Sequence, residues 1–113
     1  MNTADRVRLQ HMLEAASEAL SFVEGRNKDD LSLNRMLLLS VVKEIEIIGE
    51  AANKVSAEYR AGTPGIPWAS IVGIRNRLIH AYFDWNVEII WATLTSNLPK
   101  LVAELRHVLQ GVD

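Results

Sequence analysis

The sequence predicts an all-α protein, an up-and-down bundle of four to five helices in a single domain that spans residues 1–113. Apolar residues recur at helical spacing along most of the chain. No stretch shows the sustained alternation of apolar and polar residues that a half-buried strand would need. Glycine and proline concentrate in one short cluster between the periodic segments, which is typical of helices joined by loops.

The first periodic segment covers about residues 3–23. Its apolar side chains form one stripe: Leu9, Met12, Leu13, Ala16, Leu20 and Val23. Asn2 or Thr3 can cap its start, because a side-chain oxygen there accepts a hydrogen bond from a free N–H group of the first turn. Residues 25–27 (Gly-Arg-Asn) follow the last apolar position, so we expect the helix to end before them.

The second segment begins near Asp30 or Ser32 and runs to about Tyr59, which predicts the longest helix. Its main stripe has eight members: Leu33, Leu37, Leu38, Val41, Ile45, Ile48, Ala52 and Val55. Four more apolar residues lie on other faces: Met36, Leu39, Val42 and Ile47. A helix that is apolar on several faces needs several neighbours, and in so short a chain one of them can be another subunit. We therefore expect the chain to form oligomers.

Two further segments follow a loop at residues 62–67. Pro67 suits the first turn of the third helix, because the N–H that it lacks would have no partner there. Core positions of this helix are Trp68, Ile71, Val72 and either Leu78 or Ile79. Asp84 or Asn86 can cap the fourth segment, whose apolar stripe continues to the chain end. Pro99 interrupts this stripe and predicts a kink or a short break.

Composition narrows the classes of function. Hydrophobic residues make up 49% of the chain and charged residues 23%, which is an ordinary globular balance. The net charge of −2 argues against a generally basic, duplex-DNA-binding surface, so any contact with RNA must be local. Absent cysteines exclude disulfides and thiolate metal sites and favour a cytoplasmic location. We find no signal-peptide core at the N-terminus and expect no membrane span.

Residues 75–82, with the sequence RNRLIHAY, contain the densest polar chemistry of the chain. The two arginines carry planar, forked donors that suit phosphate oxygens. His80 is the side chain best able to move protons near neutral pH. Asn76 can both donate and accept hydrogen bonds, and Tyr82 offers a hydroxyl and an aromatic face. This segment is the predicted functional centre.

The spacing of Arg75 and His80 limits how they can cooperate. Five residues apart, they are rotated by roughly 140° on a straight helix. The helix could end or deform before His80, Arg75 could bend around it, or two copies of the segment could meet in a dimer. RNA cleavage without a metal needs a base, an acid and a cation, and one chain has one histidine here. The chemistry therefore favours the dimer.

Other polar residues have simpler interpretations. His11 and His107 lie near the chain ends without polar neighbours in sequence, so we expect them on the surface. Arg77 points away from Arg75 on a helix, which indicates a solvated or RNA-steering role. We interpret the three tryptophans as packing residues.

The pattern Arg75-Asn76-x-x-x-His80-x-Tyr82 resembles the Arg-x4-His-x-Tyr signature of the HEPN superfamily, most closely its bacterial and archaeal HepT-like branch. The block IIGEAA at residues 47–52 resembles a second characteristic block of that branch. Residues 67–68 (Pro-Trp) and a later tryptophan also agree. The similarity covers nearly the whole chain, in order and at suitable spacing.

This resemblance implies a helical homodimer in which Arg75 and His80 of both chains line a shared cleft. It implies an endoribonuclease toxin that needs neither metal nor cofactor, with Arg75 and His80 catalytic and Asn76 in support. It also implies a partner, a nucleotidyltransferase antitoxin of the MNT kind, which transfers AMP to Tyr82. Bulky, anionic AMP at that position would block the cleft and repel an RNA phosphate.

Two other functions stay open at this stage. The chain could be a non-catalytic HEPN subunit that holds a nucleotide or substrate for the nucleotidyltransferase, or a purely structural helical adaptor. Arg75 would then be a surface cation, His80 a helix-terminal residue favoured by the dipole, and Tyr82 a packing aromatic.

The second block has a structural interpretation of its own. Gly49 indicates close approach of two helices. Glu46 and Glu50 share a helix face, but no histidine accompanies them in sequence, so we expect no metal site. Glu50 is better suited to support an arginine.

Overall fold

The structure is a computed structural model that describes residues 1–80 and 85–110, and within these ranges every regular element is helical. The predicted all-α class is confirmed. In chain order the elements are α1 (Thr3–Phe22), α2 (Lys28–Leu33), α3 (Arg35–Asn53), α4 (Ala57–Ala61), α5 (Trp68–His80), α6 (Val87–Ala92), the π-helical segment η1 (Thr93–Asn97) and α7 (Leu98–Gln110). None of the described helices combines the length and apolar character needed to cross a membrane.

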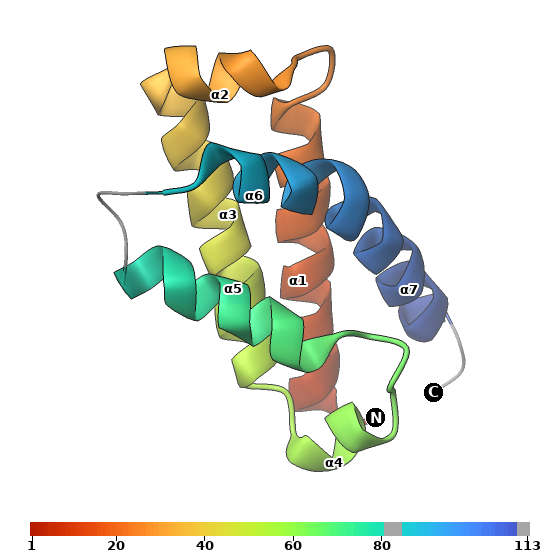
Figure 1. The fold of residues 1–113 in the computed structure, drawn as a ribbon. Coiled ribbons are helices and arrows are strands. Elements are labelled where there is room, and N and C mark those ends of the chain that lie inside the picture. Colours follow the sequence, from red (N-terminus) through yellow and green to blue (C-terminus); the bar gives the residue numbers. More distant parts are fainter. Residues whose placement is uncertain (81–84, 111–113) are drawn as a thin grey trace.

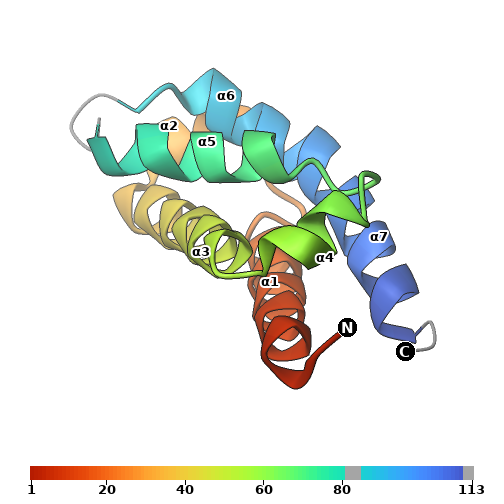
Figure 2. The same cartoon turned by 90° about the horizontal axis from the view of Figure 1, so that it is seen from below.

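The long helices α1 and α3 lie side by side and antiparallel, and the other elements are arranged around them (Figure 1). Helix α5 packs across α3, while α7 packs against α1. Seen from below, α5 and α6 lie on one side of the α1–α3 layer, and no described helix covers its opposite side (Figure 2).

The predicted stripes supply most of the core. Ten large side chains are almost fully buried: Leu9, Met12, Leu31, Val41, Val42, Ile48, Val55, Ile90, Leu94 and Leu105. Burying a side chain of this size contributes about 1.5–3 kcal/mol. One predicted stripe member is wrong, because Leu33 is 84% exposed. It ends the separate helix α2, so it does not share the face that α3 turns to the core.

The prediction of one long helix over residues 30–59 is wrong, since the chain breaks it twice. The first break is at Asn34, whose backbone is extended (φ −120°, ψ 97°). Its side chain accepts a hydrogen bond from the N–H of Leu37 at 3.1 Å and so caps α3. Helix α2 has its own start, where Asn27 and Asp30 form a reciprocal capping box.

The second break precedes α4, and a buried aspartate stabilises it. Asp5 is 4% exposed and accepts hydrogen bonds from the N–H of Ser56 at 2.8 Å and from its hydroxyl at 2.7 Å. Ser56 in turn caps α4 by accepting from the N–H of Tyr59. Burial, with a smaller contribution from Asp5, raises the pKa of Tyr59. The start of α1 is thereby tied to the turn that ends α3.

The breaker positions behave largely as predicted. Residues 62–67 connect α4 to α5, and Pro67 immediately precedes α5, where its carbonyl accepts from the N–H of Ile71 at 3.1 Å. Asn86 caps α6, whereas the other candidate cap, Asp84, lies outside the described residues. Pro99 is preceded by the wide π-helical turn of η1. A proline ring crowds the carbonyl four residues earlier, and the wider turn relieves that contact.

A second acidic residue, Glu44, is buried between α3 and α1. It is 5% exposed, and its Oε2 atom has no hydrogen-bond partner among the described residues. Burial raises its pKa to about 7, and the neighbouring Glu18 carboxylate of α1 adds to the effect. The protonated form of Glu44 is therefore favoured in the folded chain.

This residue predicts that stability falls as pH rises. The folded-state pKa of about 7 exceeds the ordinary 4.5, so the stabilisation is complete below pH 4.5 and is lost as pH passes through 7. We expect the free energy of unfolding, measured with urea, to fall by about 1–3 kcal/mol between pH 5 and pH 8. The Glu44→Gln variant should lose this dependence. Superimposable pH profiles for the variant and the unmodified chain would contradict the assignment.

Candidate active site

Helix α5 carries the polar segment, and packing residues anchor the helix at both ends. Trp68 at its start is buried and donates from Nε1 to the carbonyl of Thr63 at 3.1 Å. Near its end Leu78 is buried, and its carbonyl accepts from the Nε1 of Trp85 at 3.0 Å. The guanidinium of Arg35 at the start of α3 lies 5.5 Å from the centre of the Trp85 ring. Both tryptophans pack as predicted.

Gly49 of α3 lies directly under Arg75 of α5. A Cβ atom added at Gly49 would lie 2.6 Å from the Cγ of Arg75, closer still to its Cβ, and 3.3 Å from the carbonyl oxygen of Ile71. No side chain fits in that space. The predicted close approach of two helices at Gly49 is confirmed, and it brings the aliphatic stem of Arg75 onto the backbone of α3.

Glu50, the residue after this glycine, binds the guanidinium of Arg75. Arg75 donates from Nη2 to Oε2 of Glu50 in a close ion pair, and from Nη1 to Oδ1 of Asn76 at 2.9 Å. The other Glu50 oxygen lies 3.9 Å from Nζ of Lys54. Glu50 therefore supports an arginine, as the sequence analysis predicts, and the guanidinium is oriented by two acceptors.

The Arg75–Glu50 pair is open to solvent. The Arg75 side chain is 24% exposed and the Glu50 side chain 48%. Partly exposed ion pairs of this kind contribute only about 0–1 kcal/mol. Glu50 thus orients Arg75 without locking it, and an incoming phosphate can compete for the same guanidinium.

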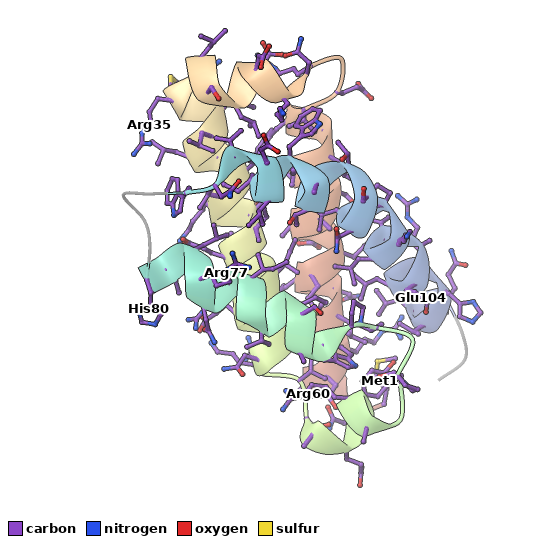
Figure 3. The ribbon with its side chains drawn as sticks, viewed as in Figure 1. Met1, Arg35, Arg60, Arg77, His80 and Glu104 are labelled. Atoms are coloured by element: carbon purple, nitrogen blue, oxygen red, sulfur yellow. The ribbon has the colours of Figure 1, made fainter. Side chains whose placement is uncertain are left out.

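His80 is the last residue of α5 and is exposed (Figure 3). The helix continues regularly to His80, so it does not end before that residue to bring the two side chains together. In the described part of the chain no hydrogen bond joins His80 to Arg75. Of the two candidates for the core, Leu78 is buried, while Ile79 beside His80 is 38% exposed. Tyr82 lies outside the described residues.

Sequence reasoning missed a basic cluster beside Glu50. A shallow hollow of about 130 Å³ is lined by Arg8 and His11 of α1 together with Glu50 of α3 and Lys54, the C-cap residue of α3. His11 is exposed, as predicted, and so is His107 at the other chain end. The only local signal is the spacing of Arg8 and His11, which puts both on the same face of α1. Their position near the motif depends on how α1 and α3 pack.

Comparison with known proteins finds a family match over most of the chain. The model of the family described as "Ribonuclease HepT-like" matches residues 12–108.

The chain belongs to the HepT-like ribonuclease family.

Several relatives match this chain over most of their own length. The protein named "Putative RNase TTE0752" of Caldanaerobacter subterraneus subsp. tengcongensis is 34% identical over 90% of this chain and 91% of its own. "Putative RNase MJ1380" of Methanocaldococcus jannaschii is 32% identical over 88% and 92%. "Probable ribonuclease HepT" of Thermococcus cleftensis is 31% identical over 79% and 84%. No solved structure shows a significant match.

The contact at Gly49 predicts a contrast between two glycines of this HepT-like chain. We expect Gly49→Ala to destabilise the fold by about 1–3 kcal/mol, because the new methyl group forces α5 away from α3. Gly73→Ala is the matched control, since a Cβ atom there meets nothing within 4 Å. Alanine inside a helix should then stabilise by about 0.5–1 kcal/mol. Urea unfolding of both variants measures the contrast, and equal effects would refute the close contact.

Proposed function

We propose that this HepT-like chain is an endoribonuclease toxin that cleaves RNA without a metal, as a homodimer in which two copies of residues 75–82 face one another. One observation carries the proposal. Arg75 is oriented at the α3–α5 contact with its side chain 24% exposed, and His80 lies exposed at the end of the same helix. Family membership adds the reaction class, because relatives that match most of this chain are named as ribonucleases.

The proposed reaction uses these groups as follows. The 2′-hydroxyl oxygen of the RNA attacks the adjacent phosphorus, while one His80 imidazole takes the hydroxyl proton. Arg75 stabilises the extra negative charge on the pentavalent phosphorane. The bond from phosphorus to the 5′-oxygen then breaks, and an imidazolium donates a proton to that leaving oxygen. The products are a 2′,3′-cyclic phosphate and a free 5′-hydroxyl.

The dimer supplies what one chain lacks. A single chain has one histidine in this segment, whereas the reaction needs a base and an acid at the same time. On α5 the side chains of Arg75 and His80 remain on different faces, so a second copy is the simplest source of the missing group. Ile79, partly exposed beside His80, offers apolar surface that this copy would cover.

Neighbouring residues take supporting roles in the proposal. Asn76 orients the guanidinium of Arg75 through its side-chain oxygen. Arg8 and Lys54 lie in the hollow beside Glu50 and can contact RNA phosphates near the reacting one. Arg77 is exposed and lies on a different face of α5 from Arg75 (Figure 3). In the proposal it attracts RNA and takes no part in the reaction. Such local cations suit a chain whose net charge is −2.

Control by a partner completes the proposal. A nucleotidyltransferase antitoxin of the MNT kind would transfer AMP to the hydroxyl of Tyr82, two residues beyond His80. The added phosphate carries negative charge and bulk, so it would compete with RNA for the arginines and obstruct the cleft. Toxin, antitoxin and RNA would meet in the cytoplasm.

The ion pair between Arg75 and Glu50 favours a second candidate function. In it, the chain is a non-catalytic subunit that binds a nucleotide or substrate for the nucleotidyltransferase. Glu50 neutralises part of the positive charge of Arg75. Such a site could hold a ligand without cleaving it. This candidate predicts nucleotide binding but no RNA cleavage.

Cleavage assays on partner-free protein separate the two candidates. We expect unmodified chain to cleave RNA in the presence of EDTA, and Arg75→Ala and His80→Ala each to reduce the rate by about 100-fold or more. His107→Ala replaces an exposed histidine at the far end of α7 and should leave the rate unchanged. Absent cleavage together with measurable AMP binding would support the second candidate. Cleavage that survives both motif substitutions would remove the motif from the mechanism.

Intact mass spectrometry tests the control by AMP. After co-expression with an active partner, the chain should gain the mass of one or more AMP groups, and Tyr82→Phe should gain none. The Tyr82→Phe protein should also stay toxic in the presence of the partner. If an active partner still neutralises this variant fully, Tyr82 is not the switch.

A further inference from the structure

A hollow of about 440 Å³ is lined by residues of α1 and α3 alone, and the proposed ribonuclease does not use it. Its walls are apolar, formed by Phe22 of α1 and by Leu39 and Ile47 of α3. Leu39 is 44% exposed and Ile47 37%, although both are large apolar side chains. The hollow also contains two carboxyl groups, Glu18 of α1 and Glu44 of α3.

These two carboxyl groups lack a cation. Among the described residues, no ion pair involves either Glu18 or Glu44. Lys43 lies at the hollow but pairs with neither. Glu44 is almost fully buried and keeps one oxygen without a hydrogen-bond partner. A buried carboxylate is costly unless a positive group pairs with it.

We propose that this hollow is a docking site for an arginine side chain presented by a helix of a partner protein. The three methylene groups of arginine would pack along Phe22, Leu39 and Ile47, as long cationic side chains do on apolar surfaces. The guanidinium would reach Glu18 and Glu44, and its forked donors match two carboxylates better than a lysine ammonium does. This inference does not depend on ribonuclease activity.

The raised pKa of Glu44 is consistent with the lack of a paired cation among the described residues. Burial and Glu18 raise its pKa to about 7, so near neutral pH the proton partly takes the place of a cation. An arginine that enters the hollow would displace this proton. The bound guanidinium would then be paired with two ionised carboxylates.

The shape of the surrounding surface indicates a helix as the carrier. Ile47 also borders the second hollow, where Arg8, His11 and Lys54 lie near Glu50. The two hollows therefore adjoin at Ile47, and we call them together the α1–α3 groove. Its acidic end contains Glu18 and Glu44, and its basic end contains Arg8, His11 and Lys54 beside Glu50. Glu44 of the first hollow and Ala51 of the second are seven residues or about 10 Å apart on α3. A partner helix with an arginine and an acidic residue two turns apart would match both ends.

The acidic end argues against RNA as the occupant, because phosphates and carboxylates repel. A partner helix that fills the whole groove would contact Glu50, the residue that orients Arg75, and would cover Arg8 and Lys54. RNA and the partner would therefore compete for the basic end of the groove.

Solution NMR on the ¹⁵N-labelled full chain tests the arginine site. The probes are N-acetyl-arginine amide and its neutral analogue, N-acetyl-citrulline amide, which keeps the shape and removes the charge. We expect saturable shifts around Glu18, Leu39 and Ile47 with the arginine probe, and at least fivefold weaker binding of the citrulline probe. Glu44→Gln should abolish the difference, whereas Glu58→Gln in α4 should keep it. Absent shifts, or equal binding of both probes, would overturn the proposal.

Light scattering distinguishes a foreign partner from a second copy. The molar mass of the unmodified chain and of Glu44→Gln should be the same at equal concentration, because the proposed dimer forms through residues 75–82 and not through the hollow. If Glu44→Gln dissociates an oligomer while remaining helical by circular dichroism, the occupant is a second copy. That result would overturn the assignment to a partner protein.

Discussion

The absence of a side chain at Gly49 is the constraint on which the site depends. It lets α5 cross α3 in backbone contact, so the stem of Arg75 rests on α3 itself. The next residue, Glu50, then lies where the guanidinium ends. Two adjacent residues therefore determine how Arg75 is placed: Gly49 sets its position, and Glu50 is its ion-pair partner. Any side chain at Gly49 would shift α5 as a unit, including buried Leu78 and terminal His80.

Apolar periodicity predicted the parts of the fold that burial determines. It located α1, the loop at residues 62–67 and the disturbed turn before Pro99. Apolar periodicity did not predict the breaks at Asn34 and Ser56. The apolar pattern continues with the same spacing across both breaks, and it contains no information about capping residues. Asn34 is a capping residue type and was visible in the sequence. The break at Ser56 depends on Asp5, 51 residues away, and no local pattern reveals that contact.

The parts of the candidate site that depend on residues close together in sequence could be predicted. The motif identified Arg75, and helical geometry showed that it could not share a face with His80 on a regular helix; α5 is regular there. Support of an arginine by Glu50 was predicted because no histidine accompanies Glu46 and Glu50 in sequence to form a metal site. The basic cluster of Arg8 and Lys54, and the meeting of Glu44 with Glu18, depend on how α1 and α3 are aligned. That alignment is set by the core and not by any motif.

The central claim is that one chain holds half of a ribonuclease site. Mixed dimers test it most directly: two differently tagged copies are co-expressed, one unmodified and one His80→Ala, and the heterodimer is purified through both tags. If base and acid come from the two chains, the heterodimer should be nearly as inactive as the doubly substituted dimer. Activity near half that of the unmodified dimer would show that each chain holds a complete site, and would contradict the account.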